Sequence, residues 1–173
     1  MSTHMFLQRR FEQPVSVDEV RGHVRDDEWC HLLHKVQWRG SFLSRDGHTL
    51  VCWFTAADAE SIRIALRQSG ADTRFLWSGT VHQEESEPPV PNALVERSFK
   101  DPVTFEEVHA VAKAARGCLQ IHRVKYSRSF FSADRKRMLC FYQAPDTESV
   151  RIIQREAGLP ADSVWSLQAI FPL

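Results

Sequence analysis

The sequence predicts an α+β fold in which one βαββαβ unit occurs twice and the two antiparallel sheets pack against each other. Three observations lead to this prediction. The chain aligns with itself at an offset of 88 residues, the same helix and strand signals recur in both copies, and the third strand of each copy is apolar at every position. Internal repeats with a fixed offset indicate a repeated structural unit.

The internal repeat aligns Arg9–Ser78 with Arg97–Ser166 without a gap, and 24 of the 70 aligned positions are identical. Average composition alone gives far fewer identities. Between the copies lies a segment rich in glutamate and proline, a composition typical of an extended spacer. We therefore expect a first repeat at residues 1–82, a linker at 83–92 and a second repeat at 93–173.

Each copy carries signals for two helices. The first helix begins with a capping box, in which a hydroxyl accepts a hydrogen bond from a backbone N–H and a glutamate bonds back. The second begins at an aspartate, which suits the positive end of the helix dipole, and ends at a glycine, which tolerates the left-handed conformation. The signals are Ser16–Glu19, Asp58 and Gly70 in the first copy, and Thr104–Glu107, Asp146 and Gly158 in the second.

The remaining apolar runs predict four strands in each copy. They lie at 5–11, 33–43, 48–55 and 75–81, and at 93–99, 121–131, 136–143 and 163–171. The third strands read LVCWF and MLCFY, and a strand that is apolar on both sides is usually covered on both sides. We therefore expect two ferredoxin-like βαββαβ repeats packed as an intramolecular dimeric α/β barrel. The alternative is two independent units.

Composition excludes several classes of protein. Lys and Arg number 22 and so do Asp and Glu, which leaves no basic surface typical of nucleic-acid binding. No apolar run is long enough to span a bilayer, and no secretory signal precedes the four cysteines. We therefore expect a cytoplasmic location with reduced thiols, and no nucleic acid or membrane as partner. The order βαββαβ also occurs in RNA-binding modules, but the third strands lack their aromatic pattern.

The second copy resembles a known family through three linked motifs. These are Ser-Phe-Phe-Ser-x-Asp at 129–134, the strand cysteine Cys140, and Ala-x-Asp-x-Glu-Ser-Val-Arg at 144–151. They are similar to the family named domain of unknown function 4242, small ferredoxin-like proteins of which some bind nickel. The resemblance implies a fold that pairs into dimers, here within one chain. Relatives that look like nickel binders carry a histidine where this chain has Gly40 and Arg128, so that nickel site does not carry over.

A Cys-x-x-x-His pattern occurs in both copies, as Cys30 with His34 and Cys118 with His122. Thiolate and imidazole together suit a transition metal such as nickel or zinc. These four residues are therefore the candidate metal ligands. The alternative is that each cysteine packs as a small apolar residue and each histidine forms a local hydrogen bond.

The second strands predict a ligand pocket. Strict alternation places His34, Trp38 and Phe42 on one face, with the equivalents His122, Tyr126, Arg128 and Phe130. An apolar, aromatic wall with a few polar groups is typical of a small-molecule site, although it is also typical of a core. The candidate ligand-binding residues are His34, Trp38, His122, Tyr126 and Arg128. We expect Gly40 to open space where Arg128 supplies a positive charge for an anionic ligand.

No catalytic motif is recognisable, whether Ser/His/Asp, a glycine-rich phosphate loop or His-Glu-x-x-His. Cys52 and Cys140 lie within strands, where a thiol is normally inert. We therefore expect no catalytic residues, and a binding protein for a metal ion or small ligand held between the repeats. The alternative is a small enzyme of the dimeric α/β barrel class, of monooxygenase or isomerase type. Further oligomerisation is left open.

Overall fold

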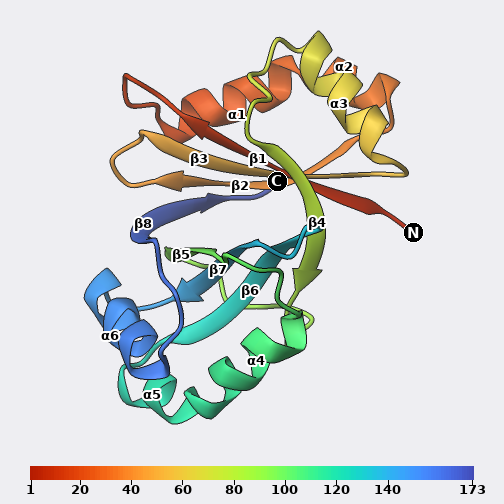
Figure 1. Ribbon diagram of the computed structural model, residues 1–173. Coiled ribbons are helices and arrows are strands. Elements are labelled where there is room, and N and C mark those ends of the chain that lie inside the picture. The colour runs from red at the N-terminus through yellow and green to blue at the C-terminus, as the bar shows by residue number, and fades with distance from the viewer. The chain divides into compact units, whose positions relative to one another are not determined.

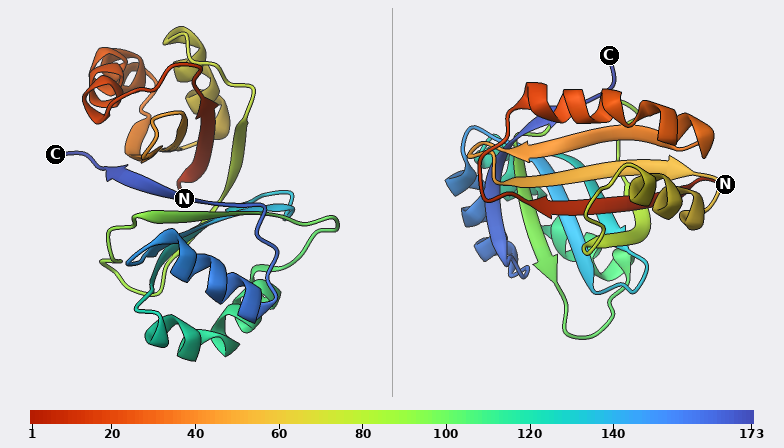
Figure 2. Two further views of the ribbon diagram at one scale, coloured as in Figure 1. Left: turned by 90° about the vertical axis from the view of Figure 1, so that its left-hand side faces the viewer. Right: turned by 90° about the horizontal axis from the view of Figure 1, so that it is seen from above.

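The computed structural model describes residues 1–173 and divides into two compact units. Unit 1 comprises Met1–Gly79 and Gln168–Leu173, and unit 2 comprises Thr80–Leu167. Each unit has one antiparallel sheet with its three helices on the same side of that sheet (Figures 1 and 2). The last six residues thus belong with the first unit, whereas the sequence placed them in the second repeat.

Unit 1 contains a four-stranded sheet. β1 pairs with both β3 and β4, and β2 pairs with β3, which gives the order β4-β1-β3-β2. The elements are β1 (Thr3–Arg10), α1 (Val17–Asp26), α2 (Glu28–Leu33), β2 (Gln37–Ser44), β3 (Thr49–Ala56), α3 (Ala59–Gln68) and β4 (Leu76–His82).

Unit 2 repeats this order of elements. β5 pairs with both β7 and β8, and β6 pairs with β7, so the strands are ordered β8-β5-β7-β6. The elements are β5 (Ala93–Ser98), α4 (Phe105–Ala114), α5 (Arg116–Ile121), β6 (Lys125–Ser132), β7 (Arg137–Gln143), α6 (Thr147–Ala157) and β8 (Ser163–Ile170). The last residues of β4, from Thr80, are assigned to unit 2, and those of β8, from Gln168, to unit 1. The predicted α+β class is confirmed. The packing of one sheet on the other stays a prediction.

The helix starts follow the predicted signals. Ser16 and Thr104 each form a complete capping box, and Asp58 and Asp146 each accept a hydrogen bond from a backbone N–H of the following turn. Gly158 ends α6 in the left-handed conformation, with φ of 66°.

The short helices α2 and α5 were not predicted. They end at Leu33 and Ile121, where the sequence predicted the second strands to begin, and those strands in fact begin at Gln37 and Lys125. α2 follows α1 after a single residue, Asp27, and has no side-chain cap. Because that junction carries no capping signal, the sequence gives no indication of a second helix there.

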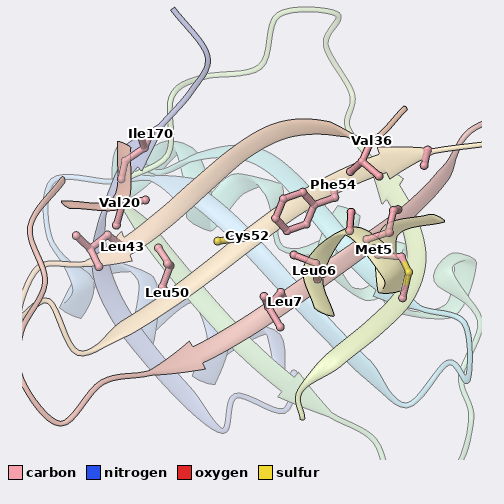
Figure 3. Packing of buried hydrophobic residues seen from close by; sticks show 13 residues of the cluster. Met5, Leu7, Val20, Val36, Leu43, Leu50, Cys52, Phe54, Leu66 and Ile170 are labelled. Carbon is pink, nitrogen blue, oxygen red and sulfur yellow. The ribbon is translucent and has the colours of Figure 1, made fainter. Parts of the chain in front are cut away.

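The core of each unit lies between its helices and its sheet. In unit 1, Met5 and Leu7 of β1 and Cys52 and Phe54 of β3 are buried together with Leu66 of α3 (Figure 3). The third strands are buried at every apolar position, as their composition predicts. No helix has both the length and the apolar character needed to cross a membrane.

A β-bulge interrupts the second strand. The register of β2 on β3 shifts between Trp38 and Gly40. Residues directly opposite each other share a face of the sheet. Trp38 lies opposite Phe54 and packs on the core beneath the helices, whereas Phe42 lies opposite Val51. The prediction that Trp38 and Phe42 share a face is therefore wrong, because one extra residue reverses the alternation.

Candidate functional site

The candidate site is a pocket of about 70 Å³ inside unit 2, between helices α4 and α5 and the strands β5, β6 and β7. Its apolar lining comes from Phe105, Val108, Leu119 and Met138. Since one water needs roughly 10–15 Å³ of such volume, the pocket has room for a ligand of several heavy atoms.

Arg97 of β5 lines this pocket and is only 1% exposed. Its Nη1 donates to the carbonyl oxygen of Pro160 at 2.8 Å, and its Nη2 donates to Oε1 of Gln154 at 2.5 Å. The remaining donations go to the hydroxyl of Tyr142 at 3.3 Å and to Sγ of Cys140 at 3.4 Å.

None of these partners is a carboxylate, and Arg97 forms no ion pair. A guanidinium stays protonated inside proteins, and burying an uncompensated charge is costly. Burial raises the pKa of the Tyr126 and Tyr142 hydroxyls, so neither phenol supplies a negative charge at neutral pH. The floor of the pocket therefore carries a buried positive charge next to neutral hydroxyl groups.

The bulge in β6 determines which hydroxyls reach the pocket. The register of β6 on β7 shifts between Tyr126 and Arg128, so that Tyr126 and Ser129 both face the helices. The hydroxyl of Tyr126 lies 2.9 Å from Oγ of Ser129, which in turn donates to Sγ of Cys140 at 3.3 Å. Tyr126, Ser129, Cys140 and Arg97 thus form one polar floor.

Basic residues gather where the helices border the pocket. His109 and Lys113 of α4 and Arg116 of α5 all line it. Arg116 forms an ion pair with Glu84 at 2.5 Å, and this glutamate is the pocket's one acidic lining residue. This excess of positive charge favours the approach of an anion.

Only one of the predicted ligand-binding residues, Tyr126, lies in the unit 2 pocket. Arg128 is buried on the opposite face of the sheet, opposite Phe141 in register, so the predicted wall shared by Tyr126 and Arg128 does not exist. The expected open space at Gly40 is also wrong, because a Cβ there would lie 2.9 Å from the ring of Phe171.

The other predicted ligand-binding residues lie elsewhere. Trp38 lines a groove on unit 1. His34 lies at the end of α2, where its Nε2 is 2.8 Å from Oε1 of Gln68. His122 lies at the corresponding end of α5, half-buried and outside the unit 2 pocket.

The predicted metal ligands differ in their surroundings. Cys30 is 1% exposed inside α2. Cys118 is half-buried, and a hydrogen bond with Glu156 raises the pKa of its thiol. The chain gathers no group of three or more His, Cys, Asp or Glu side chains that could hold a metal ion. The four-ligand set stays a prediction.

Sequence reasoning missed Arg97 and treated Cys140 as inert. A signal was present, because Ala93, Val95 and Arg97 alternate along β5 with the buried side toward the helices. A charged residue on the inward side of an otherwise apolar strand indicates a buried polar site. Because Arg9 occupies the equivalent position in the first copy, Arg97 was counted only as an identity of the repeat and not as a buried charge.

The equivalent pocket in unit 1 has a different set of polar groups, with His23, Asp27 and His31 beside Arg9. It has a volume of about 50 Å³ and is lined by Arg9 and Cys52, among others. Oγ of Ser41 donates to Sγ of Cys52 at 3.1 Å, and burial raises the pKa of that thiol to about 11. Arg9 is only half-buried and lies 5.1 Å above the ring of Phe11. A buried arginine without an ion pair is thus a property of unit 2.

A family model matches part of the chain. The family model described as "Nickel responsive protein SCO4226-like" matches residues 94–167, which lie within unit 2 and make up less than half of the chain. SCO4226 from Streptomyces coelicolor A3(2) is 16% identical, with a TM-score of 0.39, and the alignment covers 42% of this chain and 90% of that one. No curated protein matches the sequence.

Solved structures resemble the whole chain. A variant of chlorite dismutase from Candidatus Nitrospira defluvii, in complex with cyanide, has a TM-score of 0.56 at 13% identity, covering 99% of this chain and 91% of that one. A protein provisionally described as a monooxygenase, from Lactobacillus acidophilus NCFM, has a TM-score of 0.52 at 9% identity, covering 97% and 93%. At these identities the likeness shows the fold alone. The chain therefore has an α+β fold close to those of chlorite dismutase and monooxygenase structures, and residues 94–167 resemble the nickel-responsive family.

Proposed function

We propose that the protein is a non-catalytic binding protein whose unit 2 pocket holds a small organic anion, with its carboxylate group against Arg97. The observation that carries this proposal is the burial of Arg97 without an ion pair. An anion in the pocket would compensate the charge that the protein itself leaves uncompensated.

The chemistry of the floor suits a carboxylate. Arg97 has five N–H groups and uses four of them in hydrogen bonds within the protein, so one remains for a ligand. A hydrogen bond between a guanidinium and a carboxylate is stronger than one between neutral groups. Tyr126 lines the same pocket, but its single hydroxyl hydrogen already has acceptors within the protein, Oγ of Ser129 at 2.9 Å and the carbonyl oxygen of His82 at 3.2 Å. The hydrogen bond to the carboxylate therefore comes from Arg97.

The size and lining of the pocket limit the rest of the ligand. The volume of about 70 Å³ admits a short chain rather than a large ring system. Phe105, Val108 and Leu119 would surround the apolar part of such a ligand. A short-chain carboxylate such as butyrate therefore represents the proposed class.

Isothermal titration of butyrate tests this proposal, with butyramide as a neutral probe of similar shape. Arg97→Met replaces the guanidinium with an unbranched apolar side chain of similar length. Arg9→Met is the matched control at the equivalent position in unit 1. We expect the wild type and Arg9→Met to bind butyrate, and Arg97→Met to bind neither probe. Equal binding of butyrate and butyramide, or undiminished binding by Arg97→Met, would refute the proposal.

A metal ion is a second candidate ligand, favoured by the match of residues 94–167 to a nickel-responsive family. The soft ligands of that unit are Cys118 of α5 and His122, the residue after that helix, whose backbone N–H donates to the carbonyl oxygen of Cys118 at 3.1 Å. Nickel binding would use these residues rather than Arg97, so the two candidates are separable by mutation.

An enzyme of the dimeric α/β barrel class is the alternative to a binding protein. It is favoured by the likeness of the whole chain to structures described as chlorite dismutase and monooxygenase. That likeness concerns the fold, and fold alone does not specify activity. Product formation from a bound carboxylate, followed by mass spectrometry, would favour an enzyme over a binding protein.

A further inference from the structure

A second cavity, larger than the first, lies on unit 1. It is a half-open groove of about 630 Å³ along α1, α2 and the beginning of β2, and Pro172 and Leu173 complete its edge. This volume falls within the range of roughly 300–1,000 Å³ that is typical of small-molecule sites. The groove has an apolar lining of Val24, Leu32, Val36 and Trp38. The unit 2 pocket shares no residue with it.

His31 is the unusual residue of this groove. Its side chain is 7% exposed, its ring packs edge-on against Phe54 at 5.5 Å, and its Nε2 is buried without a hydrogen-bond partner. Buried polar atoms are nearly always paired, so such an atom needs an explanation. His31 lines both the groove and the inner pocket of unit 1, so its ring borders space that a ligand can occupy.

Packing alone does not require an imidazole at this position. The equivalent residue of unit 2 is Leu119, which packs against the core of its own unit. A leucine would fill the space without leaving a buried polar atom unpaired. The histidine therefore introduces a hydrogen-bonding group that the fold does not use.

The protonation of His31 indicates which partner suits it. Burial lowers its pKa, although Asp27 and Glu28 oppose this effect, so the ring is neutral at neutral pH. In a neutral imidazole, Nε2 either donates or accepts, depending on the tautomer. A hydroxyl group can do both, so it satisfies Nε2 in either tautomer.

The charges and the ring at the groove define the rest of the ligand. Four charged side chains line it, two acidic and two basic, namely Asp18, Glu28, Arg21 and Arg25. This balance favours a neutral ligand over an ion. The indole of Trp38 donates from Nε1 to Oγ of Ser41 at 2.9 Å, which holds the ring in place. A fixed indole offers a flat surface on which an aromatic ring packs well.

We propose that this groove is a second binding site, which takes a neutral aromatic alcohol of the phenol class. The ring of the ligand packs on Trp38 and its hydroxyl pairs with Nε2 of His31. The site is separate from the proposed anion site of unit 2, and neither proposal depends on the other.

Fluorine NMR titrations of the full chain with 4-fluorophenol and fluorobenzene test the proposal, because the two probes differ only in the hydroxyl. We expect the wild type to bind 4-fluorophenol about tenfold more tightly than fluorobenzene, as a buried hydrogen bond would give. His31→Leu introduces the residue found at the equivalent position of unit 2, and it should bind both probes equally. Trp38→Leu should weaken both.

The matched control is His34→Leu, because His34 lies close to His31 in sequence but outside the groove. It should keep the preference for 4-fluorophenol, and circular dichroism verifies that each variant is folded. Equal affinity of the wild type for the two probes, no binding of either, or an unchanged preference in His31→Leu would overturn the proposal.

Discussion

Replacing Arg97 by methionine should change ligand response far more than stability. The substitution leaves the carbonyl oxygen of Pro160 and the amide oxygen of Gln154 without their donor. Each unpaired buried acceptor lowers the free energy of unfolding by about 1–3 kcal/mol. In the opposite direction, it removes a buried charge that no carboxylate compensates, and apolar residues of similar volume often replace buried charges at little cost. We therefore expect the free energy of unfolding without ligand to fall by no more than about 1–2 kcal/mol.

The response to butyrate should differ clearly between the variants. A ligand at a hundredfold excess over its dissociation constant stabilises the folded state by about 2.7 kcal/mol, which raises the melting temperature by roughly 5–10 °C for a chain of this length. We expect this rise in the wild type and in the control Arg9→Met, and none in Arg97→Met. Differential scanning fluorimetry with butyrate and with butyramide measures it. A rise of equal size in Arg97→Met would show that the buried guanidinium does not bind the anion.

Three further predictions follow from other parts of the chain. Gly40→Ala should lower the free energy of unfolding, measured by urea titration, by about 1–3 kcal/mol, because the added Cβ would lie 2.9 Å from the ring of Phe171. No loss of stability would mean that this ring moves aside freely. Thiolate absorption on nickel titration should disappear in Cys118→Ser with His122→Ala but persist in the equivalent double variant of the first repeat, and the reverse pattern would contradict metal binding in unit 2. Iodoacetamide at pH 8 should label Cys52 most slowly of the four cysteines, because a pKa of about 11 leaves this buried thiol protonated up to high pH. The labelling rate of Cys52 should rise only as the pH approaches that value. Rapid labelling at pH 8 in the folded protein would contradict its burial.

The candidate site was only partly predictable. Tyr126 was identified from its place on an aromatic strand, and it does line the unit 2 pocket. Arg128 was assigned to the same wall, but the bulge at Ser127 turns it to the other face of the sheet. A bulge inserts one residue without a sequence signature of its own here, so strict alternation fails on its far side. Arg97 was missed because the signal for its burial, its alternation with Ala93 and Val95 along β5, depends on knowing which face of that strand packs under the helices.

The sequence by itself determined the order of the strands and long helices and where those helices begin. A capping box such as Ser16–Glu19 is made of neighbouring residues, and its hydrogen bonds are satisfied within one turn. The apolar composition of the third strands likewise predicted their burial. Only the tertiary structure decided which side chains meet. Arg97 reaches Gln154 and Pro160 across more than fifty residues of chain, and His31 is buried against Phe54 because α2 folds onto the sheet. Contacts of this kind depend on strand register and helix packing, and these are fixed by many distant residues acting together rather than by any local pattern.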